Sequence, residues 1–302
     1  GSVHLLRVLS RSLPVADPRG HDVSLSMGSA FEGMAMALSS HELGLSEPEF
    51  PAILEGSDQE RFAEARLVNG PGKTDPLRSW LPMRRSYRGR FLAATDEDRK
   101  ILSEAFRTAD DVTLITDRRV IASMAVRYDE ASYGFVRRPA YERELYAWMR
   151  FRKGSRDWNR DGLNADCMAL SPPERWAGAI LLHPAVYALM TRVGLGRTLV
   201  SEAAQIRSAT ALLLFHLPDA CTPFDAGRRF HRRWLELAAA GLHACPLSAL
   251  ADDPGSNAEL RALADLPRDR RLVNVLRVGR APAGAVAESP RLPAAELLSR
   301  TP

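Results

Sequence analysis

The stretch Thr210-Ala-Leu-Leu-Leu-Phe-His-Leu217 constrains the fold most, because it is a continuous apolar run of strand length. Such runs are typical of strands that are buried on both faces of a sheet. Further runs at residues 3–8, 111–116 and 271–278 predict more strands. The sequence therefore predicts a sheet that contains at least one fully covered strand.

The longest predicted helix covers residues 22–43, with Gly44 placed to end it. Phe31 and Met34 belong to an apolar stripe that recurs at three- and four-residue steps, which indicates a buried face. Small residues on the same helix, among them Gly28, would let another helix approach closely. We interpret this helix as part of the core.

Two further helices have clear starting residues. Thr95 precedes three acidic residues, so its hydroxyl can cap a helix whose positive end the acids favour. Asp117 can cap the next helix, expected through about residue 130. The apolar spacing predicts four more helices, at residues 138–150, 174–193, 226–241 and 257–266.

Composition limits the class of protein. The chain has 302 residues and 33.3 kDa, which suits one large domain or two intimately packed halves. With 45% hydrophobic and 26% charged residues it reads as soluble and globular, and no window approaches the ~18 apolar residues of a membrane helix. The basic residues are interspersed with acids and accompany no recognition motif, so we expect neither nucleic acid nor a membrane as partner.

The three cysteines, Cys167, Cys221 and Cys245, are odd in number and have no C-x-x-C spacing. This pattern argues for a reducing, cytoplasmic location and against a disulfide framework or a metal site.

The stretch Trp80-Leu-Pro-Met-Arg-Arg-Ser-Tyr-Arg-Gly-Arg-Phe91 concentrates positive charge. If it is extended, a period of two brings Arg84, Ser86, Arg88 and Arg90 to one face. That face would suit a phosphate, because guanidinium binds it with two hydrogen bonds and stays charged. The alternative is a solvated basic loop.

The run Arg84-Arg85-Ser86-Tyr87-Arg88 with Phe91 resembles the Arg-Arg-Ser-x-Arg signature of the nitroreductase superfamily. The resemblance implies that Arg84, Arg85, Ser86 and Arg88 bind FMN, the arginines through its phosphate and ribityl chain. Leu13-Pro-Val-Ala-Asp-Pro-Arg-Gly20 is similar to the opening of the Acg-type branch. That branch carries an Ala-Pro-Ser-x-His-Asn-x-Gln-Pro-Trp segment just upstream, so either the chain begins after it or the protein lacks it.

Two later stretches extend the resemblance. Gly241-Leu-His-Ala-Cys-Pro-Leu-Ser248 resembles the superfamily turn whose backbone approaches the flavin ring, which implies contacts from Ala244, Cys245, Pro246, Leu247 and Ser248. Ser289-Pro-Arg-Leu-Pro293 resembles a C-terminal Arg-x-Pro, which implies that Arg291 completes the phosphate site. We interpret Cys245 itself as a packing residue, because no histidine–acid pattern accompanies it.

Residues 152–173 are polar and irregular yet contain Trp158, which suits a covering loop better than a flexible linker. The Acg-type resemblance implies a lid over the flavin, and an ordinary connection between helices is the alternative.

Taken together, the resemblance implies an α+β nitroreductase-like fold, with a central, mostly antiparallel sheet flanked by helices. It also implies two related halves, residues 1–110 and 111–302, and a monomeric pseudo-dimer or a homodimer. The implied activity is FMN-dependent hydride transfer through flavin N5, with NAD(P)H and a flat small molecule, without an obligatory catalytic side chain or a metal. The alternatives are a flavin-sequestering protein and a degenerate scaffold without FMN.

Overall fold

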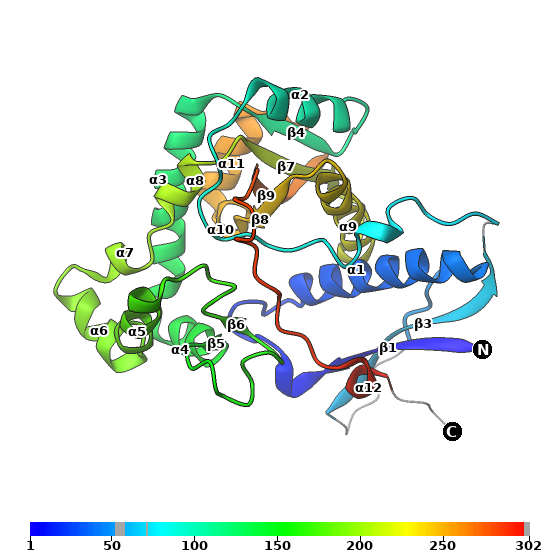
Figure 1. Cartoon of the computed structure of the whole chain (residues 1–302), viewed down its shortest axis with the longest axis horizontal. Helices are drawn as coiled ribbons and strands as arrows, with labels where there is room; N and C mark the ends of the chain where they lie inside the picture. The colour runs from blue at the N-terminus through cyan, green and yellow to red at the C-terminus, as the bar shows by residue number, and fades with distance from the viewer. Residues whose placement is uncertain (52–57, 71, 299–302) are drawn as a thin grey trace. The chain divides into compact units, whose positions relative to one another are not determined.

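The computed structural model describes residues 1–51, 58–70 and 72–298 and divides the chain into two units (Figure 1). Unit 1 comprises Gly1–Arg84 and Pro218–Ala239, and unit 2 comprises Arg85–Leu217 and Ala240–Pro302. The two related halves predicted at residues 1–110 and 111–302 concern a similarity between two parts of the sequence. The division into units does not test that similarity, so the halves stay a prediction.

Unit 1 combines an antiparallel sheet with two long helices. The sheet has the order β1 (Ser2–Val8), β3 (Gln59–Asn69) and β2 (Leu43–Leu45). Helices α1 (His21–Leu38) and α9 (Pro223–Ala239) pack along each other, and Phe31 of α1 contacts Phe224 of α9. Short 3-10 turns complete the unit, at Leu9–Arg11, Ser39–His41 and Arg78–Trp80.

The small residues of α1 allow another helix to approach closely, as the sequence predicted. A Cβ atom at Gly28 would lie 1.9 Å from the carbonyl oxygen of Phe224, and one at Gly227 would lie 1.9 Å from that of Leu25. The Ser29 hydroxyl donates to the Gly227 carbonyl at 2.9 Å. The two backbones therefore approach each other more closely than any residue with a side chain would allow.

The predicted end of α1 is wrong. The helix ends at Leu38 rather than residue 43, and Gly44 lies in strand β2. The Ser39 hydroxyl donates to the Met36 carbonyl and accepts from the Asp75 amide, which fixes the turn. Leu43–Leu45 then pairs with β3, so sheet pairing ends a helix that its sequence pattern would have continued.

The sheet of unit 2 has the order β4 (Val112–Ile115), β7 (Ala211–Pro218), β9 (Arg270–Gly279) and β8 (His243–Pro246). β4 pairs antiparallel with β7, and β8 pairs antiparallel with β9. Residues 211–217 are all buried, which confirms the covered strand predicted from the apolar run.

Helices pack around this sheet, with α3 (Arg118–Val136), α10 (Ser248–Asp252) and α11 (Pro254–Leu263) in contact and α10 against β9 (Figure 1). The predicted caps are confirmed: Thr95 forms a capping box with Asp98 at α2 (Asp96–Ala105), and Asp117 caps α3. The remaining elements are α4 (Pro139–Ala147), β5 (Met149–Arg150), β6 (Leu163–Asn164), α7 (Gly196–Leu199), α8 (Ala203–Arg207) and α12 (Ala294–Leu297).

The single helix predicted at residues 174–193 is wrong, because the structure has two, α5 (Pro172–Leu181) and α6 (Pro184–Arg192). Pro184 lacks the amide that a continuing helix needs, and it instead occupies the first turn of α6. The predicted α+β class, with antiparallel strand pairs flanked by helices, is confirmed.

Among the helices of the described ranges, none has the length and apolar character needed to cross a membrane.

Candidate functional site

The part of the arginine-rich motif in unit 2 lies beside strand β8. Ser86 forms a parallel bridge with Ala244, and the Tyr87 amide donates to the Ala244 carbonyl at 3.0 Å. Of the residues from Arg84 to Arg90, only Ser86 has strand pairing, and the common face expected for Arg84, Ser86, Arg88 and Arg90 stays a prediction. Two candidate groups that are about 160 residues apart in sequence therefore meet in space.

After this bridge the chain turns tightly around the ring of Tyr87. The buried Tyr87 contacts Phe91 with 5.4 Å between ring centroids, and its hydroxyl donates to the Arg90 carbonyl at 3.0 Å. Arg88 lies inside this turn and is half-buried, whereas Arg90 is exposed.

Arg277 of β9 holds the turn from below the surface. Its side chain is 0% exposed, and it donates to the Gly89 carbonyl at 2.9 Å and to the Tyr87 carbonyl at 3.1 Å. Its guanidinium lies 5.0 Å from the centroid of the Phe91 ring. Sequence reasoning missed this residue, although a single arginine within the apolar run Leu-Val-Asn-Val-Leu-Arg-Val was a visible signal.

Arg85 and Arg88 place positive charge near the predicted lid. Burial raises the pKa of the Cys167 thiol, and the charges of Arg88 and Arg85 oppose that rise. Within the part of unit 2 that the structure describes, no carboxylate forms an ion pair with Arg85, Arg88 or Arg291. Burial raises the pKa of the Glu202 carboxyl, and the charges of Arg277 and Arg88 oppose that rise. Guanidinium groups that form no close ion pair fit an anionic ligand such as the phosphate of FMN.

The predicted ring-contacting residues span the end of β8 and the start of α10. Ala244, Cys245 and Leu247 are buried, while Pro246 and Ser248 are half-buried. The Leu247 amide donates to the Val275 carbonyl at 2.7 Å, so it is used within the fold. Burial raises the pKa of the Cys245 thiol, with the charges of Arg277 and Arg88 opposing, and a protonated buried thiol suits the predicted packing role.

Residues 152–173 contact the C-terminal segment of unit 2 through hydrogen bonds and an ion pair. The Arg291 amide donates to the Asn159 carbonyl at 3.0 Å, while the Arg291 side chain is exposed. The Cys167 thiol donates to the Glu288 carbonyl at 3.1 Å, and Arg160 forms an ion pair with Glu296. Trp158 is buried, as expected for a covering segment rather than a linker.

Arg84 is the last residue of the first segment of unit 1. Its guanidinium lies 4.7 Å from the ring centroid of Trp234, which belongs to the same unit. Its role in flavin binding stays a prediction from the motif.

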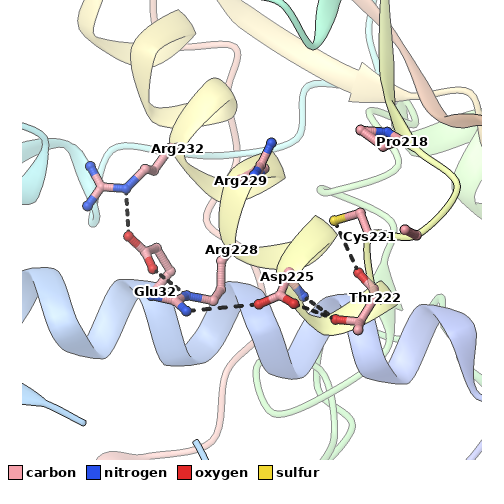
Figure 2. A pocket seen from close by; sticks show the side chains of 9 residues that line it. Glu32, Pro218, Cys221, Thr222, Asp225, Arg228, Arg229 and Arg232 are labelled. Atoms are coloured by element: carbon pink, nitrogen blue, oxygen red, sulfur yellow. Dashed lines mark hydrogen bonds and ion pairs between the residues drawn. The ribbon is translucent and has the colours of Figure 1, made fainter. Parts of the chain in front are cut away.

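Unit 1 also contains a cavity of about 540 Å³ beside the start of α9 (Figure 2). The buried Glu32 carboxylate on its wall accepts from Arg228 at 3.0 Å and from Arg232 at 2.6 Å (Figure 2). Unit 2 contains a second cavity of about 350 Å³ beside α3 and α11. Neither is lined by a predicted flavin residue.

Of three comparisons with known proteins, only the one with solved structures found matches. No protein-family model matches the chain, and no curated protein matches it. Among solved structures, it is similar to an FMN- and NADPH-dependent nitroreductase from Sphigopyxis sp. strain HMH, at 19% identity over 76% of this chain and 100% of that one, with a TM-score of 0.42.

It is also similar to an FMN-bound nitroreductase from Bacteroides fragilis, at 14% identity over 76% of this chain and 100% of that chain, with a TM-score of 0.42. A third similar structure is an FMN-dependent nitroreductase from Mycobacterium smegmatis in complex with NADPH, at 16% identity over 74% and 96% of the chains, with a TM-score of 0.40. At these TM-scores, a function for this chain rests on its own residues.

Proposed function

We propose that this protein binds FMN and transfers hydride between NAD(P)H and a flat small molecule. The observation that supports this most directly is the contact of Ser86 and Tyr87 with Ala244, because it joins the two separate motifs that resemble flavin-binding segments. The phosphate ligands would be Arg84, Arg85, Ser86, Arg88 and Arg291, and the ring would contact residues 244–248.

Each group of residues has a defined task in this proposal. The guanidinium groups of Arg85 and Arg88 bind the phosphate, and the Ser86 hydroxyl donates a further hydrogen bond. The edge strand β8 presents its end to the flavin ring. FMN itself supplies the hydride chemistry when bound, so the chain needs no side-chain acid or base.

A second function, sequestration of the flavin with little turnover, is favoured by the packing of residues 152–173. The Asn164 side chain donates to the Trp158 carbonyl at 3.0 Å and accepts from the Cys167 amide at 2.8 Å. A segment with such internal hydrogen bonds and a buried tryptophan would open slowly.

Absorbance spectroscopy of the purified protein tests FMN binding. We expect the two visible bands of oxidised flavin, either directly or after reconstitution with FMN. A colourless protein that cannot be reconstituted would contradict both functions and favour the degenerate scaffold.

Steady-state oxidation of NADPH with a quinone or nitroaromatic acceptor separates the two functions. An oxidoreductase consumes NADPH continuously, whereas a sealed flavin is reduced slowly or not at all. Flavin bleaching by dithionite without NADPH turnover would favour sequestration.

A further inference from the structure

Arg277 carries a charge at a position that bulk solvent does not reach. Its side chain is 0% exposed and sits in β9 opposite Cys245 of β8. A buried charge costs several kcal/mol unless hydrogen bonds satisfy it. The partners of this guanidinium therefore indicate what the fold retains it for.

Arg277 also interacts with the Cys245 thiol and, through its charge, with the Glu202 carboxyl group. Its two backbone partners flank a single residue. The carbonyls of Tyr87 and Gly89 accept from Arg277 at 3.1 Å and 2.9 Å, and Arg88 lies between them in sequence. Neither the peptide before Arg88 nor the one after Gly89 can rotate without breaking one of these bonds. Arg277 thus fixes the backbone from which the Arg88 side chain extends.

The neighbouring packing restricts the same turn. Arg277 and Gly279 lie on one face of β9, and both contact Phe91. A Cβ atom at Gly279 would lie 2.6 Å from Cγ of Phe91, so glycine makes room for the ring. The Tyr87 hydroxyl closes the turn from its other side through the Arg90 carbonyl.

We propose that Arg277 is a positioning residue, which holds the turn at residues 87–89 so that Arg88 is preorganised for a ligand phosphate. This inference rests on the proposed FMN function. Because Arg277 is fully buried, it acts through Arg88 and not by touching the phosphate itself. Preorganisation raises affinity because less ordering remains to be done on binding.

Binding of FMN and of riboflavin, which lacks the phosphate, tests the proposal. We compare the wild type with Arg277→Met, Arg88→Ala and the double variant by flavin fluorescence titration. Arg277→Met is expected to weaken FMN binding about tenfold and riboflavin binding less than about twofold. In the Arg88→Ala background, Arg277→Met is expected to change FMN affinity little, since the residue that it positions is gone.

Arg277→Lys separates geometry from charge. Lysine keeps the positive charge but lacks the planar fork that reaches two carbonyls, so we expect it to bind FMN as weakly as Arg277→Met. Full FMN affinity in Arg277→Lys would overturn the positioning role. Equal losses for FMN and riboflavin in Arg277→Met would also overturn it, because the defect would then lie outside the phosphate site.

Tyr87→Phe provides a milder variant if Arg277→Met does not fold. It removes only the hydroxyl bond that closes the same turn, and we expect FMN affinity to fall about threefold with riboflavin affinity unchanged. Unchanged FMN affinity would overturn the proposal. A wild-type protein that binds neither flavin overturns the proposed function and this inference together, whereas a wild type that binds FMN with an unaffected Arg277→Met variant overturns the inference alone.

Discussion

Three arginines of unit 2 differ in what their guanidinium groups contact, and this difference assigns their roles. Arg277 donates to backbone carbonyls inside the fold, and Arg280 pairs with the Asp98 carboxylate at 2.7 Å. Arg88 forms no close ion pair within the described part of its unit, although its charge acts on the buried Glu202 carboxyl. Of the three, only Arg88 is suited to an external anion.

We predict that Arg88→Ala weakens FMN binding about tenfold, because a hydrogen bond to a charged group contributes about 1.5–3 kcal/mol. Arg90→Ala is the matched control, since Arg90 is exposed and its interaction with Tyr87 uses only the backbone carbonyl. Isothermal titration calorimetry at two salt concentrations measures both. Equal affinities in the two variants would exclude Arg88 from the phosphate site.

Asp98 gives a pH-dependent prediction. Burial favours a higher pKa for its carboxyl, but hydrogen bonds from Arg280 and Thr95 outweigh burial and hold the pKa below its ordinary value. A pKa that is lower in the folded state stabilises the protein above the unfolded value, and this stability is lost as pH falls through the folded one. Asp98→Asn should therefore lower the free energy of unfolding by about 2 kcal/mol at pH 7 and flatten its decline in acid.

Urea titrations between pH 7 and pH 3 measure this effect. Asp96→Asn is the control, because Asp96 belongs to the same helix turn and its ion pair with Arg99 has a fully exposed carboxylate. If both variants lose free energy of unfolding in parallel at every pH, the Asp98–Arg280 pair does not account for the decline of that free energy in acid.

Among the helices, the contact between α1 and α9 is the most sensitive to side-chain size. We predict that Gly28→Ala lowers the free energy of unfolding by about 1–3 kcal/mol, because its Cβ would overlap a backbone carbonyl that cannot move alone. Gly134→Ala in α3 is the control, since a Cβ there meets nothing within 4 Å. It should gain up to about 1 kcal/mol from helix propensity.

Thermal unfolding followed by circular dichroism distinguishes the two alanine variants. A lower midpoint for Gly28→Ala with a higher one for Gly134→Ala supports the close approach of the helices. Two higher midpoints would show that α1 and α9 are farther apart.

A helix cap, a strand or a helix end could be predicted from the sequence only where residues close in the chain determine it. The caps at Thr95 and Asp117 and the buried run at 210–217 follow from adjacent residues, and the structure confirms them. The early end of α1 depends on pairing with β3, which no local pattern contains. The role of Arg277 likewise arises from carbonyls about 190 residues away.

For the whole molecule, the proposed function predicts stabilisation by ligand. FMN at 100 times its dissociation constant should add about 2.7 kcal/mol to the free energy of unfolding, or about 5 °C to the midpoint. Differential scanning fluorimetry with FMN and with riboflavin measures the shift. In Arg88→Ala, for which we predict about tenfold weaker binding, the FMN shift at the same concentration should fall by about half, and an unchanged FMN shift would contradict the phosphate assignment.

Unit 1 is assembled from two chain segments, and this has a consequence for synthesis. Glu32 and its partner Arg228 are 196 positions apart, so α1 leaves the ribosome long before α9 exists. At about 5–20 residues per second, the interval lasts about 10–40 s. During this time the side of the nascent helix α1 that packs on α9 has no native cover, which makes it a natural substrate for chaperones that bind growing polypeptides.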